Sequence, residues 1–168
     1  MRFQFNAHQA YQLEAIDSVV RLFQGQPANA ELLRTALAVG SLANDTQDVL
    51  DLSLEVGAIR NHFVLDDETV LENLQAVQNE NGLEISSRLI DGLQFDIEME
   101  TGTGKTYVYL RTAFELARKY NFTKFIILVP SVAIREGVRT SIQLMAPHFR
   151  ELYPDLQFDS LVYSGDRA

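Results

Sequence analysis

Residues 101–106, with the sequence TGTGKT, constrain this chain more than any other feature. Glycines let the backbone curl until successive N–H groups face one anion, and the first turn of a helix adds unpaired N–H groups and partial positive charge. Lys105 can then reach the β- and γ-phosphates, while the Thr106 hydroxyl can bind the Mg²⁺ that bridges them. The stretch therefore predicts a triphosphate-binding loop for ATP and Mg²⁺. Its residues are Thr101, Gly102, Thr103, Gly104, Lys105 and Thr106.

This loop matches the Walker A pattern G-x-x-x-x-G-K-[ST] at every position except the first, where Met99 stands in place of glycine. A chance glycine turn with a solvated lysine is the alternative interpretation. The context favours the nucleotide loop, because a strand-like segment precedes it and an amphipathic helix follows. Lys105 and Thr106 are accordingly the candidate catalytic residues, and Thr106 is the candidate ligand of Mg²⁺.

Three short segments predict strands around the loop. They are residues 93–99 (LQFDIEM), 124–130 (KFIILVP) and 158–164 (FDSLVYS). Residues 105–119 and 131–145 lie between them and carry apolar side chains at helical spacing. Alternating strands and helices predict an α/β fold, in which a parallel sheet joined by right-handed crossovers has helices on its faces.

The first half of the chain predicts helices only. Residues 7–24 form an amphipathic pattern that stops at Gly25, and residues 30–43 are weakly helical. A clearer helix covers residues 66–82, where Asp66 or Asp67 can cap the N-terminus and Gly82 can close the C-terminus.

Composition narrows the class of protein. The 168 residues have a formal net charge of −9, so the bulk chain lacks the basic surface typical of a dedicated nucleic-acid module. There is no cysteine, the N-terminus has no secretory signal, and the apolar run FIILV is too short to cross a bilayer. We therefore expect a cytoplasmic protein without membrane contact. The histidines His8, His62 and His148 lack metal-ligand spacing.

Four blocks of sequence resemble one protein family. EMETGTGKTYVYLRT, KFIILVPSVAIREGV, VLENLQAVQNENGL and AYQLEAI are similar to the Res subunit of type III restriction enzymes, whose motor belongs to the superfamily 2 helicase-like translocases. The resemblance implies a P-loop NTPase with a RecA-like first lobe, which uses ATP hydrolysis to move on double-stranded DNA before cleavage. It also implies modification (methyltransferase) subunits as partners. Residues 1–25 would form an adenine-reading helix, residues 26–92 a mainly helical insertion, and residues 93–168 the first part of the lobe.

The resemblance assigns roles to particular residues. Residues 99–106 match helicase motif I, and Gln12 falls where such motors read adenine, which an amide can contact through its donor and its acceptor together. Gln9 is the alternative, and Gln12 can also be a surface residue of an amphipathic helix. Residues 129–138 match motif Ia, which lies along a nucleic-acid strand, so Ser131 and Arg135 become candidate DNA contacts. Two other interpretations stay open: Ser131 can act only as a helix cap, and Arg135 can pair with a neighbouring acid.

Several parts of a complete motor are not found in the sequence. Neither a Walker B acid pair, nor arginine fingers, nor a nuclease domain can be placed. We therefore expect an N-terminal fragment that is truncated at its C-terminus and inactive alone. One competing interpretation is another superfamily 2 helicase without a nuclease. A P-loop nucleotide kinase would need a basic lid, and only Arg111, Arg118, Lys119 and Lys124 follow the loop before the next predicted strand. An adaptor module would leave TGTGKT unexplained.

Overall fold

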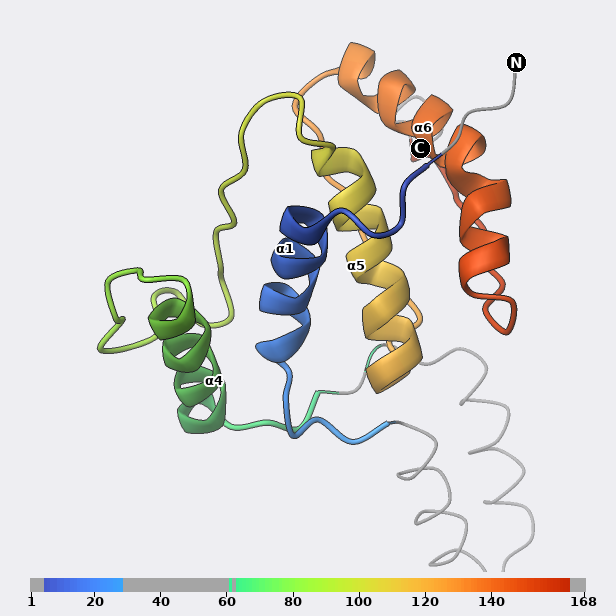
Figure 1. Ribbon diagram of the computed structural model, residues 1–168. Helices are drawn as coiled ribbons and strands as arrows, with labels where there is room; N and C mark the ends of the chain where they lie inside the picture. The colour runs from blue at the N-terminus through green and yellow to red at the C-terminus, as the bar shows by residue number, and fades with distance from the viewer. Residues whose placement is uncertain (1–4, 29–60, 62, 164–168) are drawn as a thin grey trace, which may run out of the picture.

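The structure is a computed structural model that describes residues 5–28, 61 and 63–163. Its helices are α1 (Ala10–Arg21), α4 (Asp67–Glu80), α5 (Lys105–Tyr120) and α6 (Val132–Leu152). They stand in the order α4, α1, α5 and α6 across the molecule (Figure 1). The helix predicted over residues 30–43 lies outside the described residues.

The predicted parallel sheet is wrong for this structure. Residues 93–99, 124–130 and 158–163 are neither strands nor helices, and the described part of the chain contains no sheet. A strand exists only where a neighbouring strand supplies hydrogen bonds to its backbone, and these segments do not pair with one another. Apolar side chains that buried strands would cover are exposed in these segments: Ile126 is 88% exposed, Leu128 89% and Leu161 95%.

The helices predicted within the described residues are present, and α4 and α5 lie close to their predicted bounds. Asp66 caps α4 by accepting a hydrogen bond from the backbone N–H of Thr69 at 2.8 Å. The α5 helix begins at Lys105 directly after the glycine loop and ends at Tyr120, and its C-cap Asn121 has a left-handed backbone (φ 56°). Local chemistry at the helix ends is therefore enough to fix these boundaries.

The α1 and α5 helices pack side by side around the larger apolar core (Figure 1). Ile16 and Val20 of α1 meet Val108 and Leu116 of α5 in this cluster. The Tyr120 hydroxyl donates to the carbonyl oxygen of Val20 at 3.1 Å. Because both helices run the same way, the N-terminus of α1 lies beside the glycine loop (Figure 1).

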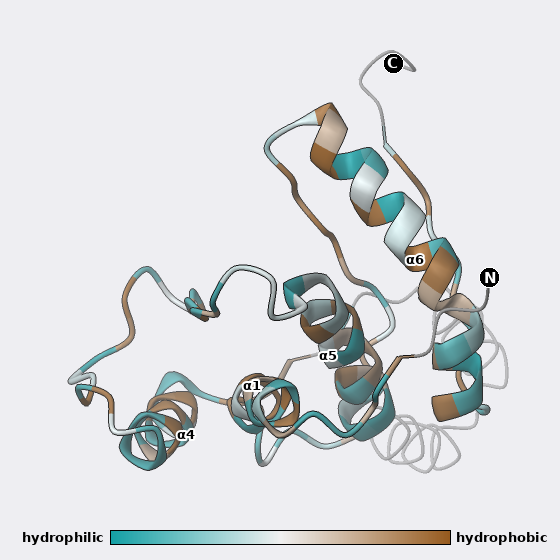
Figure 2. Cartoon of the chain, turned by 45° about the horizontal axis from the view of Figure 1, so that its top comes forward, coloured by the Kyte–Doolittle hydropathy of each residue, from teal (hydrophilic) through white to brown (hydrophobic). Residues whose placement is uncertain are grey.

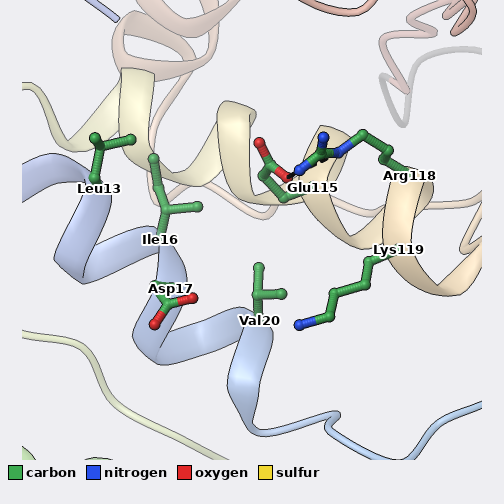
Figure 3. A pocket seen from close by; sticks show the side chains of 7 residues that line it. All are labelled: Leu13, Ile16, Asp17, Val20, Glu115, Arg118 and Lys119. Atoms are coloured by element: carbon green, nitrogen blue, oxygen red, sulfur yellow. Dashed lines mark hydrogen bonds and ion pairs between the residues drawn. The ribbon is translucent and has the colours of Figure 1, made fainter. Parts of the chain in front are cut away.

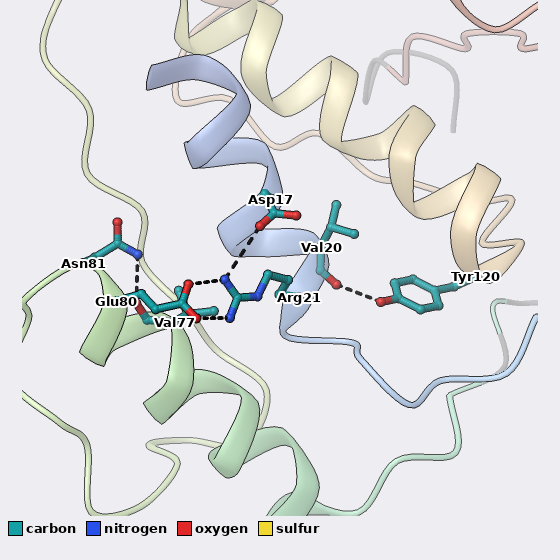
Figure 4. Close-up of polar contacts among 7 residues, drawn as sticks. All are labelled: Asp17, Val20, Arg21, Val77, Glu80, Asn81 and Tyr120. Carbon is teal, nitrogen blue, oxygen red and sulfur yellow. Dashed lines mark hydrogen bonds and ion pairs between the residues drawn. The ribbon is translucent and has the colours of Figure 1, made fainter. Parts of the chain in front are cut away.

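An ion pair joins α1 to α4. Arg21 of α1 forms a bidentate contact with the Glu80 carboxylate, and Asp17 lies 3.8 Å from the same guanidinium (Figure 4). The pair is partly exposed, and exposed pairs contribute only about 0.2–1 kcal/mol. It orients α4 more than it stabilises the fold.

The interface of α5 and α6 combines stacked rings with buried polar groups. Phe149 is 1% exposed, and its ring lies 4.7 Å from that of Phe114. The Tyr107 hydroxyl lies 3.0 Å from Nε2 of His148, which couples the two helices through a polar contact. Burial lowers the pKa of His148, the positive charge of Arg111 lowers it further, and Glu151 opposes the shift.

This histidine predicts a pH dependence of stability. A folded-state pKa below the ordinary value of 6.5 means that the unfolded chain binds a proton first as the pH falls. The stabilisation is therefore complete above pH about 6.5 and is lost as the pH falls through the folded-state pKa. Between pH 7.5 and 5.5 the wild type should lose more unfolding free energy than His148→Gln, whose amide still accepts from Tyr107 without titrating. Chemical denaturation at each pH measures this. His8 and His62 cancel in the comparison, and parallel curves for the two proteins would contradict the assignment.

An apolar groove of about 1160 Å³ lies between α5, α6 and the extended segments 122–132 and 156–163. Figure 2 shows apolar residues along the extended chain between α5 and α6. These are the residues that the sequence places in a buried sheet. Among the described residues, no helix is long and apolar enough to cross a membrane.

Candidate nucleotide-binding site

The loop before α5 is shaped by two left-handed glycines. Gly102 has a φ of 84° and Gly104 a φ of 87°, and Gly104 is the N-cap of α5. A side chain is strained at such angles, so the curl depends on glycine at both positions. The Thr103 hydroxyl donates to the carbonyl oxygen of Glu100 at 2.6 Å, which closes the turn on itself. The N–H groups of the first turn of α5 follow this loop and have no acceptor within the helix.

Lys105 and Thr106 open α5 and are available to a ligand. Lys105 is exposed and forms no hydrogen bond or ion pair with the residues that the structure describes. Thr106 is half-buried, and no described residue bonds its hydroxyl. A free cation and a free hydroxyl at a helix N-terminus fit a phosphate with its bridging Mg²⁺. The described residues contain no cluster of His, Cys, Asp or Glu that could hold a metal by itself.

Gln12 lies against this loop rather than on the protein surface. Its side chain is buried at 7% exposure, and Nε2 donates to the carbonyl oxygen of Thr103 at 2.8 Å. A Cβ atom at Gly104 would lie 2.6 Å from the same nitrogen, closer than such atoms approach in real structures. Gln12 and the loop are therefore fitted to each other across 91 residues of sequence.

The hydrogen bond to Thr103 limits which atoms of the Gln12 amide can contact a base. The sequence predicts that both polar atoms of the Gln12 amide contact adenine, but Nε2 already donates to the loop. Its Oε1 accepts no hydrogen bond from the described residues, so it remains free for the N6 amine of adenine. The alternative, Gln9, precedes α1 as its N-cap, and its Oε1 accepts from the Tyr11 hydroxyl.

The motif Ia residues lie at the N-terminus of α6. The Ser131 hydroxyl caps this helix by accepting from the backbone N–H of Ile134 at 3.3 Å. Arg135 pairs with the neighbouring Glu136 at 3.3 Å. The structure thus contains the cap and the ion pair that the sequence analysis leaves open as alternatives, and it does not test DNA contact.

A hollow of about 570 Å³ lies between α1 and α5 (Figure 3). Its α5 side chains are at positions 115–119, ten or more residues after Lys105, so about 15 Å of helix separates them. Acidic and basic side chains face it together, and Glu115 pairs with Arg118 there at 2.6 Å. A mixed lining of this kind does not suit a triphosphate, so we do not assign the hollow to the nucleotide.

The sequence analysis misses one buried group, Arg111, which it treats only as one of several basic residues after the loop. It is 8% exposed and bonds the carbonyl oxygen of Ala7 at 2.6 Å. The available signal was its position on α5 between the core residues Tyr107, Leu110 and Phe114, the face that packs against α6.

Comparison with known proteins defines the class. The sequence model described as "Type III restriction enzyme, res subunit" matches residues 7–166, which is nearly the whole chain. The chain therefore belongs to this family of helicase-like restriction enzyme subunits.

Individual relatives agree with that assignment. The chain is 41% identical over 85 residues to the type III restriction-modification enzyme StyLTI Res subunit of Salmonella typhimurium, a match that covers 49% of this chain and 9% of the relative. It is 37% identical over 93 residues to the EcoPI Res subunit of Escherichia phage P1, with 53% and 10% covered. The EcoP15I Res subunit of Escherichia coli is 36% identical over 93 residues, with the same coverage. The matches thus span about a tenth of each relative. No solved structure matches significantly.

Proposed function

We propose that the chain is the ATP-binding part of a DNA-dependent ATPase and translocase of a type III restriction enzyme. The observation that carries this proposal is the pair of left-handed glycines directly before Lys105, which is exposed and has no partner among the described residues. Family membership supports the same interpretation, because it places the chain among helicase-like subunits.

In this proposal each residue of the site has a separate task. The loop residues 101–104 surround the phosphates with backbone N–H groups, Lys105 neutralises the β- and γ-phosphates, and Thr106 offers its hydroxyl to Mg²⁺. The metal, when bound, offsets the charge of the phosphate oxygens. Gln12 accepts a hydrogen bond from the N6 amine of adenine while its Nε2 holds the loop.

The proposal extends to DNA and to partner subunits. The relatives are named as subunits of restriction-modification enzymes, which supports double-stranded DNA and modification subunits as partners of the whole protein. Ser131 and Arg135 at the N-terminus of α6 are the proposed phosphate contacts. Fluorescence anisotropy of a labelled duplex measures this, and equal affinities of the wild type and Arg135→Ala would remove Arg135 from the interface.

A calorimetric titration with ATP·Mg²⁺ tests the nucleotide proposal. We expect saturable binding of one nucleotide per chain, competition by inorganic tripolyphosphate, and much weaker binding of AMP, which lacks the β- and γ-phosphates. The absence of saturable binding, or equal affinities for AMP and ATP, would contradict a triphosphate site.

Gln12→Ala should reduce the preference for ATP over GTP by about fivefold, corresponding to one hydrogen bond of about 1 kcal/mol. Guanine carries an acceptor at position 6, which faces the Gln12 oxygen unfavourably, whereas adenine carries a donor. The ratio of the two affinities isolates this effect, because any change in the phosphate loop affects both nucleotides. Gln9→Ala is the matched control. If Gln9→Ala lowers the ratio and Gln12→Ala does not, Gln9 reads the base.

A further inference from the structure

Arg111 forms three hydrogen bonds that reach different parts of the described chain. Its Nη1 donates to the carbonyl oxygen of Ala7 at 2.6 Å and approaches the Tyr107 hydroxyl at 3.3 Å. Its Nε donates to the Tyr153 hydroxyl at 3.2 Å, and that hydroxyl donates to Glu115 at 2.5 Å. One side chain therefore joins α5 to α6 and to the segment that leads into α1.

Among the described residues, no carboxylate bonds this buried guanidinium directly. It is 8% exposed, and the partners that bond it are a carbonyl and two hydroxyl groups. Removing a charge from water costs free energy, and an apolar side chain of similar length often fills such a place without loss of stability. The fold alone gives little reason for an arginine here, so its directed hydrogen bonds point to a positional task.

The contacts of Arg111 frame the candidate nucleotide site. Ala7 lies five residues before Gln12, and Arg111 lies five residues after Thr106. Two tethers thus connect the start of α1 to the start of α5: one from Gln12 to the loop at 2.8 Å, and one from Arg111 to Ala7 at 2.6 Å. Together they fix the position of the Gln12 amide relative to the phosphate loop.

We propose that Arg111 is a positioning residue, which clamps the segment before α1 onto the P-loop helix and so sets the register between the adenine-contacting amide of Gln12 and the phosphate-binding loop. This inference rests on the proposed function. ATP must satisfy the base contact and the loop at the same time, whereas inorganic tripolyphosphate uses only the loop. Loss of the clamp therefore weakens ATP selectively.

Arg111→Met removes the donors and keeps an apolar side chain of similar length. We expect its affinity for ATP·Mg²⁺ to fall about tenfold, as for the loss of one charged hydrogen bond, and its affinity for tripolyphosphate to change less than twofold. Lys119→Met is the matched control, because Lys119 is an exposed cation on the same helix and takes no part in these hydrogen bonds; it should change neither affinity. If Arg111 only supported the fold, Arg111→Met would lower the number of binding-competent molecules, which a titration reports as a lower stoichiometry. The ratio of ATP to tripolyphosphate affinity would then stay unchanged.

Arg111→Lys decides the question should the methionine variant fail to fold. It keeps the charge but cannot bond Ala7 and Tyr153 in the same forked geometry. We expect the ATP affinity of Arg111→Lys to fall selectively by about threefold, so that it lies between the affinities of the wild type and Arg111→Met. An unchanged ratio of ATP to tripolyphosphate affinity, whether both affinities stay the same or both fall by the same factor, would overturn the inference while leaving the triphosphate site intact. Failure of the wild type to bind either ligand would overturn the proposed function and this inference together.

Discussion

Lys105→Ala should weaken the binding of ATP·Mg²⁺ by about 30-fold or more, equivalent to about 2 kcal/mol for a lost charged hydrogen bond. The lysine opens α5, is exposed, and has no partner among the described residues, so its removal leaves the fold unchanged. Calorimetry of the two proteins measures the effect, and thermal unfolding should give the same midpoint for both.

A second lysine on the same helix serves as the control. Lys119 lies near the C-terminus of α5, with its ammonium group 5.5 Å from the centre of the Tyr120 ring. Lys119→Ala removes the same charge far from the loop and should leave ATP affinity within about twofold, because an exposed charge at that distance is screened. Equal losses from the two variants would mean that net charge, and not the loop, governs the binding.

Gly104→Ala should disrupt both the loop and its contact with Gln12. The left-handed backbone costs a non-glycine residue about 1–2 kcal/mol. The new methyl group would also lie 2.6 Å from the Gln12 amide, which must move and release the Thr103 carbonyl, at a further cost of about 1 kcal/mol. We expect a clear fall in unfolding free energy and loss of measurable ATP binding.

Gly102→Ala separates the two causes. Gly102 has nearly the same φ, but a Cβ atom there would meet no atom within 4 Å. Its cost should therefore be the backbone strain alone, about 1–2 kcal/mol by denaturant unfolding. A destabilisation as large as that of Gly104→Ala would show that the Gln12 contact contributes nothing.

The helices could be predicted from the sequence because their signals are local. Asp66 and Ser131 each precede an amphipathic stretch and cap it in the structure, and α5 begins at the predicted residue after the glycines. Capping and periodicity act within a few residues, so one sequence carries them. The α6 helix continues to Leu152, beyond the predicted end at residue 145, because apolar contacts of Phe149 extend it.

The sheet could not be predicted reliably, because a strand depends on a partner elsewhere. A continuous apolar run such as residues 125–129 favours a buried strand, yet in this structure it is extended and largely exposed. The apolar composition of such a segment suits a buried strand, but strand pairing also requires neighbouring strands with a matching register. No sequence pattern specifies those neighbours.

In the candidate site too, the local features could be predicted from the sequence and the long-range contacts could not. The loop residues follow from their own spacing, and Gln12 was found through a resemblance. Its bond to Thr103 and the clamp from Arg111 to Ala7 join residues 91 and 104 positions apart. Helical position indicates that Arg111 faces the interior, but only the packing of α1, α5 and α6 determines which atoms it bonds. These long-range contacts are what couple the two parts of the site.

In the proposed site, ATP binds at the loop before α5, with its base toward Gln12. Two-dimensional NMR of the labelled chain during titration with ATP·Mg²⁺ tests it most directly, because each backbone or side-chain amide reports its own surroundings. We expect the largest shifts at Gly102, Gly104 and Lys105 and in the Gln12 side chain, and we expect tripolyphosphate to reproduce the loop shifts only. Shifts confined to the apolar groove of α5 and α6, with the loop unmoved, would contradict it.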